Sequence, residues 1–91
     1  QKFKAFTRPT INTPKQNGQE LTIKVTDEEG LDYVVYSVNG KKYKWVSTTE
    51  GRKEWTHVHK LEPGENVIII KAMNKAGIEA NTFKGKCIYT P

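Results

Sequence analysis

Residues 34–45 read VVYSVNGKKYKW, and this stretch predicts a β-hairpin. Every second residue from Val34 to Val38 shares one face, which is the period of two that a half-buried strand shows. Asn39-Gly40 supplies the turn, because a type I′ turn needs positive φ at both central residues and Asn-Gly tolerates this best. The turn fixes the register of the hairpin. The expected cross-strand pairs are Val38 with Lys41, Tyr36 with Tyr43, and Val34 with Trp45.

Similar short segments lie on both sides of this hairpin, with Gly, Pro or Asn turns about every ten residues. Leu21, Ile23 and Val25 alternate with polar residues, whereas no segment has the period of an amphipathic helix. We therefore predict an all-β fold, an antiparallel β-sandwich of about seven strands. The expected strands are 3–6 or 10–12, 21–26, 34–38, 41–45, 55–61, 66–73, and a last strand from 78–80 and 83–89, broken or bulged at Gly85.

The composition fits a single domain that covers residues 1–91. Of the 91 residues, 35% are hydrophobic and 27% are charged, and the formal net charge is +5. This length supports one core. The longest apolar run, Val67–Ile70, is far shorter than the roughly 20 residues of a membrane helix, so we expect no membrane insertion. Because the chain begins with Gln and has Cys87 as its only cysteine, we expect a segment excised from a longer protein, without an internal disulfide.

Two longer stretches carry the motifs of a known family. Residues 21–40 read LTIKVTDEEGLDYVVYSVNG, and residues 61–80 read LEPGENVIIIKAMNKAGIEA. They resemble the bacterial immunoglobulin-like domains of secreted and cell-surface proteins. In that family a strand ending in Val-Thr-Asp, an acidic turn with Gly and a Val-x-Tyr-x-Val-Asn-Gly strand precede a Gly-x-Asn turn, an Ile-rich strand and an Asp-Lys-Ala-Gly-Asn turn. Here Asn74 and Ile78 replace the usual Asp and Asn of the last turn.

This resemblance implies an immunoglobulin-like fold and a non-catalytic module located outside the cell or on its surface. Such a module acts as a spacer and as a protein-interaction or adhesion domain. Its partners are neighbouring domains of the same chain or another protein. The alternative is a carbohydrate- or cell-wall-binding accessory module of a secreted enzyme.

The residues themselves predict no enzyme, no cofactor and no metal site. His57 and His59 lie two apart on a predicted strand and point to the same side, but no further ligand follows at a spacing typical of zinc sites. The acidic residues between Asp27 and Asp32 cluster in one turn without the spacing of a calcium loop. We therefore expect half-exposed strand histidines and solvated turn carboxylates.

Apolar side chains at outward positions predict a contact patch on one sheet. Residues 66–73 are apolar at both strand phases, and the strand before Asn39 also has apolar outward positions. The predicted patch consists of Tyr33, Val35, Val67 and Ile69, with Lys42, Lys44 and Lys71 at its rim. The basic edge favours an acidic or mixed partner. Two simpler explanations stay open, namely β-propensity alone and coverage by the terminal segment 3–6.

A second candidate site is aromatic. Exposed aromatic rings can stack on sugars, and the candidate glycan-stacking residues are Tyr43, Trp45 and Trp55, although Trp45 also fits a place at the core margin. The lysines are dispersed and no RNA-binding motif accompanies them, so we expect no nucleic acid. A glycan or an anionic cell-wall polymer suits this basic surface better.

Overall fold

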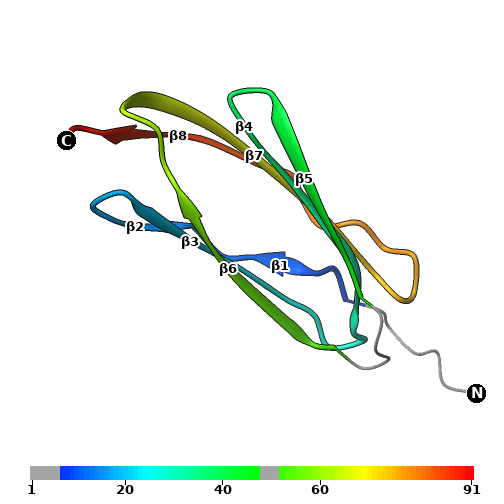
Figure 1. Cartoon of the computed structure of the whole chain (residues 1–91). Coiled ribbons are helices and arrows are strands. Elements are labelled where there is room, and N and C mark those ends of the chain that lie inside the picture. Colours follow the sequence, from blue (N-terminus) through cyan, green and yellow to red (C-terminus); the bar gives the residue numbers. More distant parts are fainter. Residues whose placement is uncertain (1–6, 48–51) are drawn as a thin grey trace, which may run out of the picture.

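The computed structural model describes residues 7–47 and 52–91. These residues form two antiparallel sheets and contain no helix, so none of them forms a helix able to cross a membrane (Figure 1). The strands are β1 (Thr10–Ile11), β2 (Lys15–Asn17), β3 (Glu20–Thr26), β4 (Leu31–Val38), β5 (Lys41–Val46), β6 (Glu54–Lys60), β7 (Gly64–Asn74) and β8 (Phe83–Tyr89). The predicted all-β class is confirmed, and two facing sheets are compatible with a β-sandwich.

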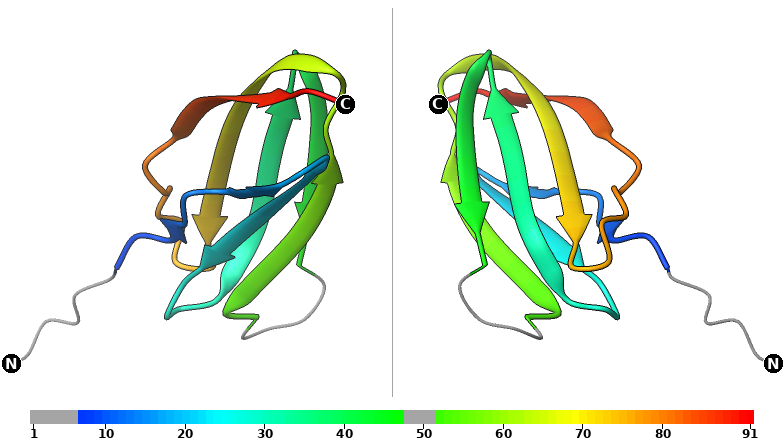
Figure 2. Two further views of the ribbon diagram at one scale, coloured as in Figure 1. Left: turned by 90° about the vertical axis from the view of Figure 1, so that its left-hand side faces the viewer. Right: turned by 90° about the vertical axis from the view of Figure 1, so that its right-hand side faces the viewer.

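One sheet, called sheet B here, has the strand order β5-β4-β7-β8 (Figure 2, right-hand view). Its first hairpin confirms the predicted register, because Val38 pairs with Lys41, Tyr36 with Tyr43, and Val34 with Trp45. Asn39 and Gly40 have φ angles of 52° and 86°, as a type I′ turn requires. The local sequence therefore determines this half of the sheet.

The other sheet, sheet A, is built on β3. β6 pairs with one edge of β3, and β1 and β2 pair with the other. The prediction of a strand at 10–12 is confirmed in part by β1, whereas the alternative at 3–6 lies outside the described residues. β2 was not predicted, because all three of its residues are exposed and polar and carry no apolar alternation.

The core lies between the two sheets and is formed by the inward-facing residues, every second one, of each long strand. The predicted inward residues of β7, Ile68, Ile70 and Ala72, are at most 2% exposed, which confirms the strand phase. The fully buried apolar side chains come from both sheets. The core consists of Leu21, Ile23, Val25, Leu31, Val34, Tyr36, Val38, Trp55, Leu61, Ile68, Ile70, Ala72 and Ala80.

The last strand differs from the prediction in two respects. Residues 78–80 form only an isolated bridge between Glu79 and Met73 and no strand. β8 runs through Gly85 without a break. A Cβ at Gly85 would lie 2.9 Å from Cζ of Phe83, so the glycine makes room for this ring and does not mark a bulge.

Two buried asparagines hold the ends of β7. The Asn66 side chain accepts a hydrogen bond from the Glu62 amide at 3.2 Å and donates to the Glu62 carbonyl at 2.9 Å. At the other end, Asn74 donates to the carbonyl of Thr7 and to Asp27, and accepts from the Ile78 amide. These bonds satisfy polar backbone groups where the chain enters and leaves the strand.

Truncating Tyr36 to alanine should lower the free energy of unfolding by about 3 to 5 kcal/mol, the range for large side chains in cores. Tyr36 is 5% exposed and stacks on Tyr43 with ring centroids 5.0 Å apart. Urea denaturation measures the change. The control Tyr36→Phe keeps the ring and should cost about 1 kcal/mol or less. An alanine variant as stable as the wild type would contradict this placement of the core.

Asn66→Ala should destabilise the fold by about 1 to 3 kcal/mol, because it leaves buried backbone groups without partners. For a domain of this size, each kcal/mol lowers the melting temperature by about 4 to 8 °C, which calorimetry detects. Asn81 is exposed, so Asn81→Ala should change stability by no more than about 0.5 kcal/mol. Equal melting temperatures for the two variants would show that the amide of Asn66 is dispensable.

Candidate functional site

The structure places all four residues of the predicted patch on the solvent-facing side of sheet B, called the outer face here. Residues paired across an antiparallel sheet share a face. The rows across the sheet are Val46-Tyr33-Met73, Lys44-Val35-Lys71, Lys42-Ser37-Ile69-Lys84, Val67-Lys86 and Glu65-Ile88. Tyr33 and Val35 thus lie on β4, beside Val67 and Ile69 on β7, as the outward phase predicts.

The apolar residues of the outer face are only partly covered. Val67 is 39% exposed, and Tyr33, Val35 and Ile69 are half-buried. The Lys44 ammonium lies 5.3 Å from the centre of the Tyr33 ring, so it shields one side of that ring.

Two neighbouring hollows indent the outer face, and Val35 and Lys71 border both of them. One has a volume of about 160 Å³ and reaches Ser37, Lys42 and Ile69. The other has about 290 Å³ and reaches Tyr33 and the segment that leads into β8. The lining of the smaller hollow is mainly apolar, whereas the larger hollow has a mixed lining that includes Glu79 and Thr82.

The lysines of the outer face differ from the prediction in position and number. Lys71 does not belong to the rim, because it lies on a central strand opposite Val35. Lys84 and Lys86 on β8 were missed and complete the far edge. The sequence Lys84-Gly85-Lys86 could have indicated them, because two lysines separated by one residue lie on the same face of a continuous strand. Two carboxylates share this face, Glu65, which forms an ion pair with Lys86 at 3.5 Å, and Glu79 near the opposite end.

A second cluster, called the aromatic seam here, joins the edge strands β5 and β6, which lie on the same side of the two sheets (Figure 2). Trp45 stacks on Trp55 with ring centroids 5.8 Å apart, and Trp55 stacks on His57 at 5.6 Å. Tyr36 and Tyr43 both contact His59. The seam closes the core where the two edge strands do not pair with each other.

The seam gathers the three candidate glycan-stacking residues but uses their rings internally. Trp55 is 7% exposed and lies between Trp45 and His57. Trp45 packs against the core, and the Arg52 guanidinium lies 5.5 Å from the centre of its ring. Tyr43 stacks on Tyr36. A sugar stacking here would have to displace these contacts.

The two histidines point to the same side of β6, as the strand period predicts, and that side is the inner one. The Tyr36 hydroxyl lies 3.4 Å from Nδ1 of His59, within hydrogen-bond range. Burial first, then the charges of His57 and Lys41, lower the pKa of His59, although Glu62 acts in the opposite direction. Burial, followed by the nearby Tyr43, raises the pKa of Tyr36. Both rings are therefore neutral parts of the seam at neutral pH.

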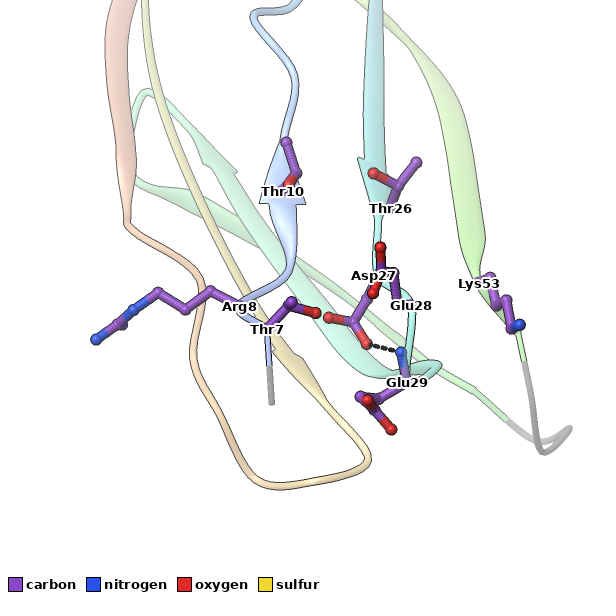
Figure 3. A pocket seen from close by; sticks show the side chains of 8 residues that line it. All are labelled: Thr7, Arg8, Thr10, Thr26, Asp27, Glu28, Glu29 and Lys53. Carbon is purple, nitrogen blue, oxygen red and sulfur yellow. Dashed lines mark hydrogen bonds between the residues drawn. The ribbon is translucent and has the colours of Figure 1, made fainter. Parts of the chain in front are cut away.

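The acidic turn after β3 borders an open hollow of about 770 Å³ (Figure 3). Asp27 is buried and accepts hydrogen bonds from the Glu29 amide at 2.7 Å and from the Asn74 side chain at 3.2 Å. Its oxygens thus shape the turn, so the prediction of a solvated carboxylate is wrong for Asp27. Within residues 7–47 and 52–91, no group of three or more His, Cys, Asp or Glu side chains is arranged to hold a metal ion.

Comparison with known proteins identifies no relative of this chain. The sequence matches no family model, and neither a curated protein nor a solved structure matches it.

The stability of the fold should decrease as the pH falls below about 6.5, the pKa of an unperturbed histidine. Because the pKa of His59 is lowered in the folded state, the unfolded chain takes up the proton first, and protonation favours unfolding. Above about pH 6.5, His59 is neutral in both the folded and the unfolded chain, so it causes no further change in stability. Melting temperatures between about pH 5 and 8 test this.

The substitution His59→Gln should flatten that pH profile. His57→Gln removes only one neighbouring charge, so most of the dependence should persist, because burial is the first cause of the shift. An unchanged slope in the His59 variant would assign the pH dependence to other groups.

Proposed function

We propose that this chain is an immunoglobulin-like module of a bacterial extracellular or cell-surface protein. It is non-catalytic and serves as a spacer and as a protein-interaction or adhesion domain. Two antiparallel sheets around one core support the fold assignment. The motifs at residues 21–40 and 61–80 support the family, the bacterial origin and the location outside the cell.

The observation that carries the interaction role is the outer face of sheet B. Most of its apolar residues lie on the two central strands, where Tyr33, Val35, Ile69 and Met73 are half-buried and Val67 is 39% exposed. On the edge strands, Val46 and Ile88 are 51% and 65% exposed. Solvent-facing apolar residues gathered on one face mark contact sites more often than scattered ones do. Partners of this face are a neighbouring domain of the same chain or another protein.

The side chains that could carry chemistry support a non-catalytic role, because they take part in the fold. His59 contacts Tyr36, and Asp27 bonds to Asn74 and to the backbone of its own turn. The accessory role in binding neutral glycans gains no support from the seam, since its rings stack on one another.

Sedimentation velocity over a concentration series tests the interaction role. At about 0.5 M salt the lysines are screened, and the apolar outer face should give weak, concentration-dependent association. Ile69→Glu should abolish this association and leave the chain folded. Because Ile69 is half-buried, the substitution should lower the free energy of unfolding by about 0.5 to 3 kcal/mol.

The matched control is Thr56→Glu on the solvent-facing side of sheet A, which should associate as the wild type does. A wild-type chain that stays monomeric at every concentration would count against the contact face. Unfolding of the Ile69 variant would show instead that Ile69 belongs to the core.

A further inference from the structure

The two solvent-facing sides of this chain differ in composition, although both are β-sheet surfaces. The side of sheet A is rich in threonine and has nearly balanced charge. It consists of Thr10, Lys15, Asn17, Glu20, Thr22, Lys24, Thr26, Glu54, Thr56, Val58 and Lys60. The outer face of sheet B uses Val, Ile, Met and Tyr at equivalent positions and carries five lysines. Since threonine satisfies β-propensity equally well, propensity alone does not explain the apolar residues of sheet B.

Most lysines and most apolar residues of the outer face lie on different strands. The exceptions are Lys71 on the central strand β7, and Val46 and Ile88 on the edge strands β5 and β8. β5 carries Lys42 and Lys44, and β8 carries Lys84 and Lys86, whereas β4 and β7 carry most of the apolar floor. The row Lys42-Ser37-Ile69-Lys84 shows this order across the whole sheet. Two rows of positive charge therefore flank an apolar floor.

The width of this floor matches one helix. Neighbouring strands lie about 4.8 Å apart, so the two lysine rows are about 14 Å apart at the backbone. An α-helix with its side chains is about 10 to 12 Å wide. The smaller of the two hollows that share Val35 and Lys71 can receive an apolar side chain of such a helix, and the larger, mixed hollow can receive a side chain from the next turn.

We infer that the outer face of sheet B binds an amphipathic α-helix of a partner protein, with Asp or Glu residues on both sides of its apolar stripe. This inference rests on the interaction role proposed above and specifies the partner. The apolar stripe covers Val35 and Ile69, and the acidic flanks pair with the lysine rows of β5 and β8. Lys71 lies opposite Val35 and borders both hollows, so its ammonium adds a further positive charge for an acidic flank.

Charge and apolar surface together favour this occupant over two others. A polyanion such as an acidic polysaccharide would use the lysines but would leave the apolar floor unused. A second copy of the chain would bring lysine rows against lysine rows and be repelled at physiological salt. The carboxylates of Glu65 and Glu79 lie towards opposite ends of the face, so neither separates the two rows.

Three synthetic peptides of about 20 residues test the inference by fluorescence anisotropy. The first has a leucine stripe flanked by glutamates, the second has lysines in place of the glutamates, and the third is the first interrupted by two prolines. At low salt the chain should bind the glutamate peptide and not the lysine peptide. Binding of the proline-containing peptide should be at least about tenfold weaker, because proline breaks the helix.

Charge reversal in the chain supplies the matched variants. The double substitution Lys42→Glu with Lys84→Glu reverses one charge on β5 and one on β8, on either side of Ile69. It should weaken binding of the glutamate peptide at least about tenfold and create affinity for the lysine peptide. Lys24→Glu with Lys60→Glu reverses two charges on sheet A and should leave the affinity within about twofold. Melting curves confirm that both variants are folded.

Equal binding of the glutamate and lysine peptides, or no binding of either, would overturn the inference. Equal binding of the proline-containing peptide would show that no helix is needed. Displacement of the glutamate peptide by polygalacturonate at equal charge concentration would identify a polyanion site instead. If these tests fail while Ile69→Glu still abolishes self-association, the contact role stands and only the partner chemistry is wrong.

Discussion

The fixed ends of β7 are the constraint on which the rest of sheet B depends. This strand pairs with β4 on one side and with β8 on the other, and its inward residues fill the middle of the core. Asn66 and Asn74 are at most 1% exposed, and their amides bond to the turns that lead into and out of the strand. A shift of β7 by one residue would break both sets of bonds and would turn Ile68 and Ile70 towards solvent.

The same constraint positions the outer face. When β7 is held, its pairing with β4 sets Ile69 opposite Ser37, and its pairing with β8 sets Ile69 opposite Lys84. The two lysine rows and the apolar floor are thus consequences of the register that the core requires. The residues of the two lysine rows and of the apolar floor all belong to hydrogen-bonded strands, so the register of the sheet sets their relative positions.

Sequence patterns predicted those parts of the structure that depend on residues close together in the sequence. The Asn39-Gly40 turn sets a two-residue hairpin by itself, and alternation gives the phase of β3, β4 and β7. The central position of Lys71 follows from the β4–β7 pairing, which no local pattern encodes. Lys84 and Lys86 were missed because Gly85 normally indicates a bulge, whereas here it accommodates the Phe83 ring. The contacts of Asp27 with Asn74 link residues far apart in the sequence.

The aromatic seam has a structural role that favours the sheet face over the tryptophans as the proposed contact site. β5 and β6 are edge strands of different sheets, so no backbone hydrogen bonds close the core between them. The stacked rings of Trp45, Trp55 and His57 fill this opening and keep water from the core residues behind them. Removing a ring to bind a sugar would expose that core, whereas the outer face of sheet B can be covered or uncovered without any change in the packing between the sheets.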